Sequence, residues 1–438
     1  MRVALYTLGC KVNQFETAAL AEGFISKGAD IVPYTQEADI YVVNTCTVTS
    51  RAACQSRQIL RRVRRSRKKA RVIAAGCYVQ TGAQEILEAV PGQICLVGND
   101  QKAHLVDLAF ELEDGLEFYV GNISRVAAIA PFTIKRQWGR TRAFVRIQDG
   151  CNSFCTYCIV PYARGRSRSL APELVERQID ILVQEGIKEV VLTGIHIGMY
   201  GDDLLEKTSL LCLLKRLCPA FPELRFRLSS IEPSEITPDM ISWAMSTPNF
   251  CPHWHISLQS GSDKILKLMN RRYTSSLYRD LIMQLRTAMP ESAIGSDVLV
   301  GFPGEDGPAF QKTLELISEL PITYVHAFPF SPRPGTIAAE MKNMVTKKEK
   351  VKRAQAVRDL GFEKKQAFYR LHVEKIVECL MEGRDKETGL WKGLAPNYIP
   401  VLVEAGMDQA DLKNQILPVR ITKAERGMVF GTLLKQKI

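Results

Sequence analysis

The stretch Gly150-Cys-Asn-Ser-Phe-Cys-Thr-Tyr-Cys-Ile-Val-Pro161 has three cysteines in the pattern C-x3-C-x2-C: Cys151, Cys155 and Cys158. Their thiolates can bind three irons of an iron–sulfur cube and leave the fourth iron open. A structural zinc site needs four protein ligands, and a bacterial ferredoxin run has a fourth cysteine and another spacing. Here the next cysteine is Cys212. The pattern therefore favours a cluster with an open iron over zinc or chance clustering.

The cysteine loop follows a strand-like run, Phe144–Gln148, after which strand and helix patterns alternate. Further strands are expected at Val190–Ile195, Arg225–Ser230, Trp254–Gln259, Ala293–Gly301 and Tyr324–Phe330. Such alternation predicts a parallel sheet, and six units predict a partial (β/α)6 barrel with the cysteine loop at its carboxyl-end face. His255 and His326 fall within these strands, where we expect hydrogen-bonded core histidines rather than ligands.

The first hundred residues form a second alternating series. Strands are expected at Val3–Leu8, Asp39–Asn44, Val72–Ala75 and Ile94–Val97, and helices at Gln14–Lys27 and Arg51–Lys68. This order predicts a doubly wound parallel sheet, in which ligands bind outside the carboxyl ends of the strands.

Three cysteines follow strands of this sheet: Cys10, Cys46 and Cys77. A lone cysteine is usually a small buried hydrophobe, and Cys54 and Cys95, inside a helix and a strand, fit that role. Three cysteines at equivalent strand ends are better explained by convergence on a second metal cluster.

The last part of the chain follows a charged, helix-prone link from Met341 to Arg370. Short strands are then expected at His372–Cys379, Leu390–Leu394, Ile399–Val403, Leu417–Ile421 and Met428–Leu433. They predict a small antiparallel β-barrel, a shape often used on nucleic acid. The expected domains are residues 1–115 (the doubly wound sheet), 137–367 (the barrel core) and 370–437 (the β-barrel).

Positive charge is concentrated in one segment. The net charge is +11, and Arg51 to Arg71 has ten basic residues and no acidic one. A solvated helix face usually mixes signs, so this stripe favours binding of a polyanion such as nucleic acid. The predicted RNA-binding residues are Arg57, Arg61, Arg62, Arg64, Arg65 and Lys68.

The composition is that of a soluble protein, with 46% hydrophobic and 24% charged residues among 438. The apolar run at the start of the sequence is too short for a signal peptide and is followed too soon by polar residues. No apolar run reaches membrane-spanning length. Twelve cysteines without a secretory signal argue for metal or redox use rather than disulfides. We expect a cytoplasmic protein with no membrane contact.

The C-x3-C-x2-C loop resembles the radical S-adenosylmethionine (SAM) superfamily. The resemblance implies a [4Fe-4S] cluster that binds SAM at its open iron and, reduced by a low-potential electron donor, cleaves it to a 5′-deoxyadenosyl radical. It also implies that Tyr157 lies near the adenine. Strand-end residues implied to bind SAM are Thr193, Gly194, Gln259, Asp297 and Gly301.

Over nearly its whole length the chain resembles the methylthiotransferase family, whose C-terminal barrel is a TRAM domain. The resemblance implies two [4Fe-4S] clusters, one on Cys151, Cys155 and Cys158 and one on the three N-terminal cysteines. It further implies SAM as both methyl donor and radical source, and a sulfur donor. Two departures stand out: the superfamily's Gly-Gly-Glu motif is replaced by Thr193-Gly-Ile, and the C-terminal barrel matches only loosely.

The stretch Thr7-Leu-Gly-Cys-Lys-Val-Asn-Gln-Phe-Glu-Thr17 decides the expected branch, through Lys11, Val12 and Gln14. It resembles the branch that methylthiolates C2 of N6-threonylcarbamoyladenosine at position 37 of tRNA, with the anticodon arm as partner. Three alternatives remain open: the branch acting on N6-isopentenyladenosine-37, the branch acting on a ribosomal-protein aspartate, and a non-catalytic metal-containing RNA-binding protein.

Overall fold

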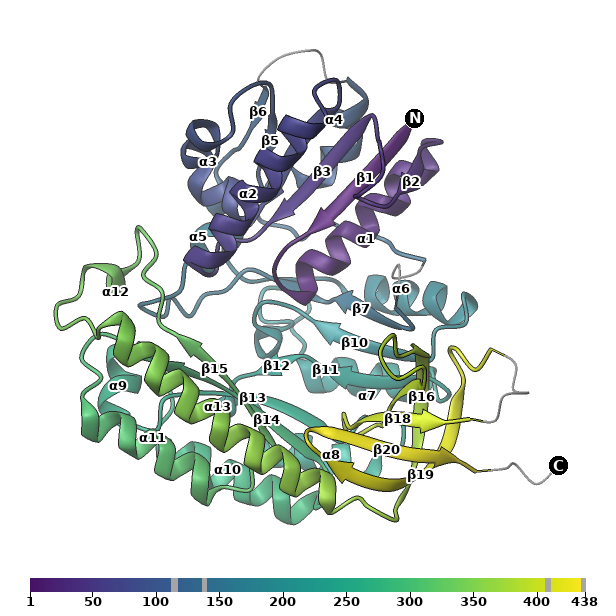
Figure 1. Cartoon of the computed structure of the whole chain (residues 1–438), viewed down its shortest axis with the longest axis vertical. Helices are drawn as coiled ribbons and strands as arrows, with labels where there is room; N and C mark the ends of the chain where they lie inside the picture. The colour runs from purple at the N-terminus through teal and green to yellow at the C-terminus, as the bar shows by residue number, and fades with distance from the viewer. Residues whose placement is uncertain (112–116, 136–139, 406–410, 435–438) are drawn as a thin grey trace.

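The computed structural model describes residues 1–111, 117–135, 140–405 and 411–434. The expected domain boundaries at 115, 137 and 437 lie outside these residues, and those at 367 and 370 fall inside one long helix. An N-terminal α/β unit lies above a larger barrel-like core, and a small β-barrel lies at one side of that core (Figure 1).

The N-terminal unit is a six-stranded parallel sheet in the order β2-β1-β3-β4-β5-β6. Its strands are β1 (Arg2–Thr7), β2 (Asp30–Val32), β3 (Ile40–Thr45), β4 (Arg71–Gly76), β5 (Cys95–Val97) and β6 (Glu117–Tyr119). Its helices are α1 (Lys11–Ser26), α2 (Ser50–Ser66), α3 (Cys77–Ala89) and α4 (Leu105–Glu111). The doubly wound fold is confirmed. The sequence analysis missed only β2 and β6, whose three residues each are too short for a periodic signal.

The core has two parallel sheets, β11-β10-β7 and β12-β13-β14-β15. Its parallel strands are β7 (Arg142–Arg146), β10 (Glu189–Thr193), β11 (Arg225–Leu228), β12 (Ser230–Ile231), β13 (His253–Gln259), β14 (Ala293–Val300) and β15 (Tyr324–Pro329). The third expected strand is interrupted at Ser229, which divides it into β11 and β12. A short antiparallel pair, β8 (Gln148–Asp149) and β9 (Arg168–Ser169), flanks the cysteine loop. The partial barrel is confirmed.

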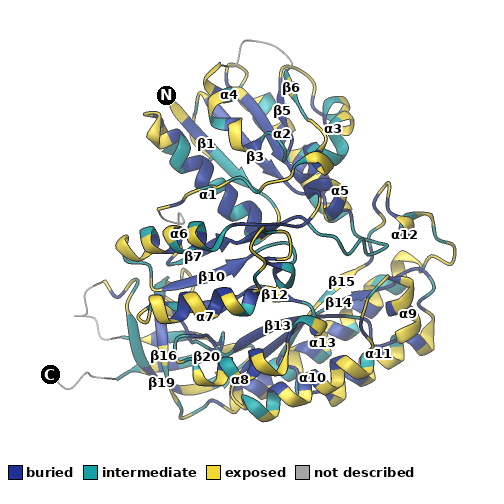
Figure 2. Cartoon of the chain, turned by 180° about the vertical axis from the view of Figure 1, so that it is seen from behind, coloured by how far each residue is buried: buried dark blue, intermediate teal, exposed yellow. Residues whose placement is uncertain are grey.

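Helices cover the outside of the core and present exposed outer faces, whereas the strands are mostly buried, with β15 as the exception (Figure 2). They are α5 (Val160–Arg164), α6 (Pro172–Gln184), α7 (Leu210–Ala220), α8 (Pro238–Ser246), α9 (Asp263–Leu268), α10 (Ser275–Ala288), α11 (Gly307–Glu319), α12 (Ile337–Glu340) and α13 (Lys347–Arg370). The strands read as apolar runs because both faces of a parallel sheet are covered.

The C-terminal strands close into a barrel in the order β16-β17-β18-β20-β19. They are β16 (Ile376–Arg384), β17 (Trp391–Leu394), β18 (Pro400–Glu404), β19 (Ile416–Glu425) and β20 (Met428–Leu433). Four neighbouring pairs are antiparallel, but β18 and β20 run parallel. The expected small β-barrel is present, but the expectation that all its strand pairs are antiparallel is wrong. A closed ring with an odd number of strands must contain a parallel pair. The first strand also starts later than expected, because His372 is hydrogen-bonded to the Phe368 carbonyl in the last turn of α13.

Candidate active site

The three clustered cysteines lie in the loop between the first core strand and α5, at the carboxyl-end face of the barrel. All three are partly buried. The loop is attached to the far side of the barrel, where Thr156 donates from its backbone N to the Met269 carbonyl (3.1 Å) and from Oγ1 to the Leu268 carbonyl (2.8 Å). The thiols are therefore held near the strand ends at both sides of the barrel.

A cavity of about 320 Å³ opens beside Cys155. Charged groups line it: Arg271 donates from Nη1 to Glu232 Oε1 at 2.8 Å, and His196 Nε2 lies 2.5 Å from Glu235 Oε1. Among the described residues, one buried nitrogen here, Arg271 Nε, has no hydrogen-bond acceptor. Such a polar cavity fits the amine, carboxylate and ribose groups of SAM next to a cluster.

His196 also connects this cavity to the cysteine loop. Its Nδ1 lies 3.4 Å from Cys151 Sγ and 3.2 Å from Ser153 Oγ. Sequence reasoning missed His196, Glu232, Glu235 and Arg271. Their only shared signal is a position just after a strand or short helix on the carboxyl-end face.

The six residues predicted to contact SAM lie on separate elements of the core. The Tyr157 hydroxyl accepts from Arg271 Nη2 at 2.8 Å, so its ring lies with the cysteine loop and the cavity. Thr193 is buried, and Gly194 leaves no room for a side chain, since a Cβ would lie 2.8 Å from Gln148 Oε1. That same oxygen accepts from the backbone N of Ile195 and His196, which shapes this strand end.

The other three lie on β13 and β14. Gln259 ends β13 with φ +60°, and Gly301 follows β14 with φ +71° against the side chain of Lys350. Asp297 contacts His255 and His326 inside the barrel. The expectation of two core histidines is wrong for His326, whose side chain is 55% exposed.

Gly150 precedes the cysteine loop in a conformation that only glycine adopts without strain. Its φ is +73°, and a Cβ would lie 1.9 Å from the Arg166 carbonyl oxygen.

Replacing Gly150 with alanine is therefore expected to displace the loop and to lower both the iron bound by Cys151, Cys155 and Cys158 and the rate of SAM cleavage. The left-handed backbone alone costs about 1–3 kcal/mol, and the contact with a backbone carbonyl adds to it. Iron analysis and 5′-deoxyadenosine assay check this. Gly307→Ala is the matched control, because a Cβ there meets no atom within 4 Å. Equal iron contents in the two variants would contradict the prediction.

The three N-terminal cysteines converge at one edge of the sheet. Cys46 follows β3, Cys77 begins α3 after β4, and Cys10 precedes α1. A Cβ at Gly9 would lie 2.9 Å from Cys46 Sγ, so the loop holding Cys10 passes directly over Cys46. Burial, together with the nearby thiols of Cys77 and Cys10, raises the pKa of Cys46 to about 12.

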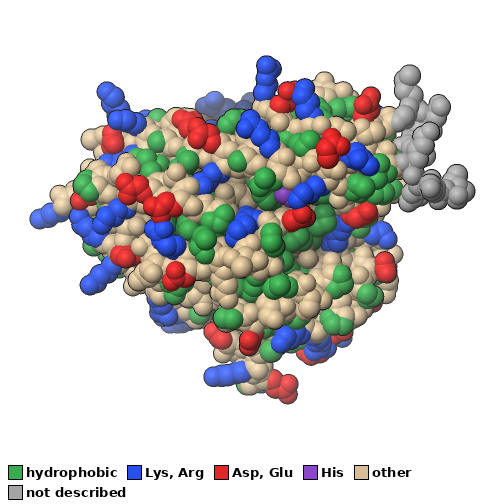
Figure 3. Space-filling view, turned by 90° about the horizontal axis from the view of Figure 1, so that it is seen from below, with side chains coloured by type: hydrophobic (Ala, Val, Ile, Leu, Met, Phe, Trp, Pro, Cys, Tyr) green, Lys and Arg blue, Asp and Glu red, His purple; other side chains and the backbone are tan. Residues whose placement is uncertain are grey.

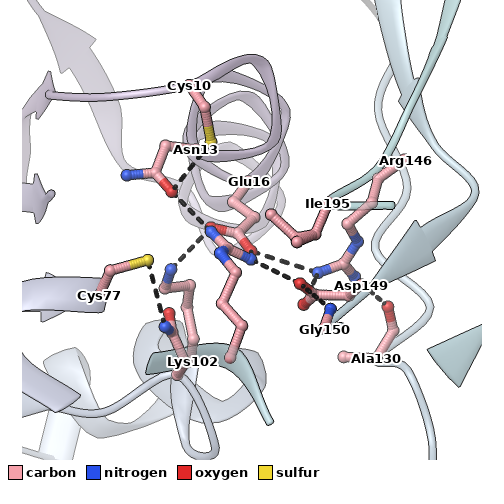
Figure 4. A network of polar contacts seen from close by, with 12 residues as sticks. Cys10, Asn13, Glu16, Cys77, Lys102, Ala130, Arg146, Asp149, Gly150 and Ile195 are labelled. Atoms are coloured by element: carbon pink, nitrogen blue, oxygen red, sulfur yellow. Dashed lines mark hydrogen bonds and ion pairs between the residues drawn. The ribbon is translucent and has the colours of Figure 1, made fainter. Parts of the chain in front are cut away.

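A buried ionic network lies between the N-terminal cysteines Cys10 and Cys77 and Gly150, the residue before Cys151 (Figure 4). Arg164 donates to Asn13 Oδ1 (2.6 Å), to Glu16 Oε1 (2.9 Å) and to Asp149 Oδ1 (2.9 Å). Asp149 Oδ1 also accepts from the backbone N of Gly150 at 2.9 Å, next to Cys151. The helix that follows Cys10 and the loop that begins at Cys151 are thus bound to one guanidinium.

Glu16 is the anionic centre of this network. Its carboxylate lies 2.6 Å from Lys102 Nζ and 3.2 Å from Arg146 Nη1, and all of these side chains are buried. Burial alone would raise the pKa of Glu16, but Arg164 and Lys102 hold it well below its usual range. The charge pairs thus span the boundary between the N-terminal unit and the core.

The basic stripe lies along α2. Arg61, Arg62, Arg65 and Lys68 are exposed. Arg57 contacts the Tyr78 hydroxyl and pairs with Glu85, and Arg64 donates to the Ala70 carbonyl. On the face of the molecule seen from below, acidic and basic side chains are interspersed, in contrast to the basic stripe of α2 (Figure 3).

Comparisons with known proteins identify the family. Residues 2–98 match the model of the uncharacterized protein family UPF0004, and residues 145–317 match that of the radical SAM superfamily. The threonylcarbamoyladenosine tRNA methylthiotransferase MtaB of Aquifex aeolicus is 39% identical over 403 residues, 92% of this chain and 96% of that protein. This chain belongs to the radical-SAM tRNA methylthiotransferase family. It is an enzyme, which excludes the non-catalytic alternative.

A second protein similar to this methylthiotransferase is named for a different nucleoside. The tRNA-2-methylthio-N(6)-dimethylallyladenosine synthase of Bartonella henselae is 30% identical over 444 residues, 99% of this chain and 96% of that protein. The structure of TsrM, a radical SAM methyltransferase from Kitasatospora setae, covers 77% of each chain with a TM-score of 0.57 at 15% identity, a likeness in fold. No described helix is long and apolar enough to cross a membrane.

Membership in the radical SAM superfamily implies SAM and a [4Fe-4S] cluster. The loop from Cys151 to Cys158 fits this pair in two respects. It has three thiols and no fourth protein ligand in its pattern, and beside it lies a charged cavity in which the buried Arg271 Nε has no acceptor among the described residues.

Proposed function

We propose that this methylthiotransferase adds a methylthio group to C2 of N6-threonylcarbamoyladenosine at position 37 of tRNA. The observation that carries the proposal is the 39% identity, over 92% of the chain, to a protein named for that nucleoside. The relative named for dimethylallyladenosine, the isopentenyladenosine branch, is 30% identical and supports the second candidate substrate. The residues Lys11, Val12 and Gln14 favour the first of the two.

The proposed SAM site is the cavity beside Cys155, with the cluster on Cys151, Cys155 and Cys158. When bound and reduced, the cluster supplies the electron that cleaves SAM and yields the 5′-deoxyadenosyl radical. The chain's own residues orient the ligands: His196 holds the Cys151 thiol, and Arg271 and Glu232 face the cavity with opposite charges. Tyr157 packs edge-on against Phe302 and shields the loop from water.

The proposed sulfur-delivering cluster lies on Cys10, Cys46 and Cys77, and a sulfur donor would replenish it. Two neighbours support this site: Asn99 Nδ2 donates to Cys77 Sγ at 3.5 Å, and Arg164 lies close enough to interact with Cys10 and Cys77. A buried cation stabilises thiolates, which are the form that binds iron. The radical-forming cluster would take its electron from a low-potential donor.

The proposed tRNA surface combines the basic stripe of α2 with the C-terminal barrel, which together would hold the anticodon arm. The logarithm of the binding constant falls linearly with the logarithm of the salt concentration. Each phosphate contact that is lost reduces the size of this slope by slightly less than one.

The triple variant Arg61→Ala, Arg62→Ala, Arg65→Ala is therefore expected to bind tRNA more weakly and with a slope smaller by about 2–3. Dissociation constants measured at several salt concentrations check this. Its control is Arg177→Ala, Lys188→Ala, Lys215→Ala, which removes the same charge from exposed positions of the core. Equal affinities of the two variants would show that α2 does not contact tRNA.

The substrate is tested by nucleoside mass spectrometry of tRNA from cells with and without the gene. Loss of the methylthio form of threonylcarbamoyladenosine alone is the expected result. Loss of methylthio-isopentenyladenosine would assign the second candidate substrate. Unchanged tRNA would overturn both and favour the branch that acts on a ribosomal protein.

A further inference from the structure

Three potential metal ligands meet on neighbouring core strands, apart from both cysteine triads. They are His255 on β13, Asp297 on β14 and His326 on β15. One nitrogen of each imidazole faces the same carboxylate oxygen: His255 Nε2 lies 2.9 Å and His326 Nδ1 3.3 Å from Asp297 Oδ1. Among the described residues this is the one group of three or more such side chains whose ligand atoms lie within 4.8 Å of one another.

The spacing of these atoms is that of ligands around one ion. Bonds of about 2.0–2.2 Å to nitrogen and oxygen put neighbouring tetrahedral ligands about 3.3 Å apart. The buried Asp297 Oδ1 has no assigned hydrogen-bond partner within the part of the chain that the structure describes, although both imidazole nitrogens lie within 3.3 Å of it. An oxygen approached by two nitrogens fits a cation lying between the three atoms.

The surroundings hold the ligands in position. The Tyr324 hydroxyl lies 3.1 Å from His255 Nδ1 and 2.7 Å from His253 Nε2, which orients the imidazole through its second nitrogen. Metal-binding histidines in proteins are oriented in this way.

The site is also accessible. His326 and Tyr324 line a cavity of about 510 Å³ between β15, α13 and the C-terminal barrel. Arg358, Lys365 and Tyr398 line the same cavity. An ion held by three protein ligands on one side would keep open positions toward this space, as catalytic zinc and facial-triad iron sites do.

Lys11 is the competing partner of Asp297. The two interact, and Arg142 and Arg227 lie near the same lysine but are paired with Glu382 and Glu189. Without an ion, Lys11 would be the cation that balances Asp297.

We propose that His255, Asp297 and His326 bind one divalent transition-metal ion of the zinc or iron(II) class. With two imidazoles and one carboxylate, the ligand set is that of open, catalytic metal sites. This site would be a third metal centre of the enzyme, and its existence does not depend on which nucleoside is the substrate.

Zinc is the probe for the test. The protein, with its clusters reconstituted, is equilibrated with excess zinc, freed of unbound metal, and analysed for zinc and iron together. The wild type is expected to retain about one zinc per chain that is lost in His326→Ala and Asp297→Asn, with unchanged iron. His104→Ala, at an exposed histidine of the N-terminal unit, is the control and should retain the zinc.

The iron content shows whether each variant has folded, and His326→Ala removes a side chain that is more than half exposed. X-ray absorption at the zinc edge should show nitrogen and oxygen ligands without sulfur. Equal zinc contents in the wild type and His326→Ala, or a sulfur-ligated zinc, would overturn the proposal and leave Lys11 as the partner of Asp297.

Discussion

Replacing Cys151 with serine is expected to abolish formation of 5′-deoxyadenosine from SAM, while the cluster proposed for the N-terminal triad is kept. Changes to residues that only support metal ligands cost about 10–100-fold in activity, so loss of a ligand should cost more than about 100-fold. Cys151 is also the thiol that His196 contacts, at 3.4 Å, so the substitution removes both a ligand and its orienting contact.

Two readings of the same sample check this prediction. Product analysis should show no 5′-deoxyadenosine, and iron should fall from about eight to about four per chain, as expected for loss of one of two cubane clusters. Cys212→Ser is the matched control, because Cys212 is exposed on α7 and outside both triads. Retained SAM cleavage in the Cys151 variant would show that this loop is not the radical-forming site.

Replacing Glu16 with glutamine is expected to lower the free energy of unfolding by about 3–5 kcal/mol, the usual cost of removing one partner from a buried ion pair. The neutral amide would leave Arg164, Arg146 and Lys102 buried around a side chain without charge. Because these cations come from both the N-terminal unit and the core, the variant should also separate the two units at lower denaturant concentration.

Urea denaturation at neutral pH, followed by tryptophan fluorescence, measures this loss. Asp107→Asn is the control: it breaks the exposed pair with Lys27 at the end of α1 and should change the curve little. The pH dependence gives a second check. The folded pKa of Glu16 is depressed, so its stabilisation is present above the unfolded value of about 4.3 and is lost as the pH falls below it. If the wild type exceeded Glu16→Gln in free energy of unfolding by the same amount at pH 7 and pH 3, the ionic explanation would be contradicted.

The sequence predicted much of the fold because its signals are local. Apolar runs such as β3, in which all six residues are buried, identify strands directly, and cysteines after successive strands indicate a common edge. The C-x3-C-x2-C loop indicated the cluster through spacing alone. Boundaries were predicted less well where one element leads into another, as at His372, which lies in the turn after α13 rather than beginning a strand.

Long-range pairing explains what the sequence did not show. Glu16 and Arg164 are 148 positions apart, and nothing near either residue indicates that they meet. His326 belongs to an apolar strand pattern, yet its exposure depends on the cavity that α13 and the C-terminal barrel leave beside it. The polar groups around Cys155 likewise come from separate loops that only the closed arrangement of strands brings together.

The proposed function is tested most directly by giving the reconstituted enzyme, with SAM and reductant, three tRNAs that differ only at nucleoside 37: threonylcarbamoyladenosine, isopentenyladenosine or adenosine. Mass spectrometry of the digested tRNA gives the product. We expect a methylthio group on threonylcarbamoyladenosine alone, with 5′-deoxyadenosine formed alongside it. Methylthiolation of isopentenyladenosine, or 5′-deoxyadenosine without any methylthio product on the three tRNAs, would contradict the account.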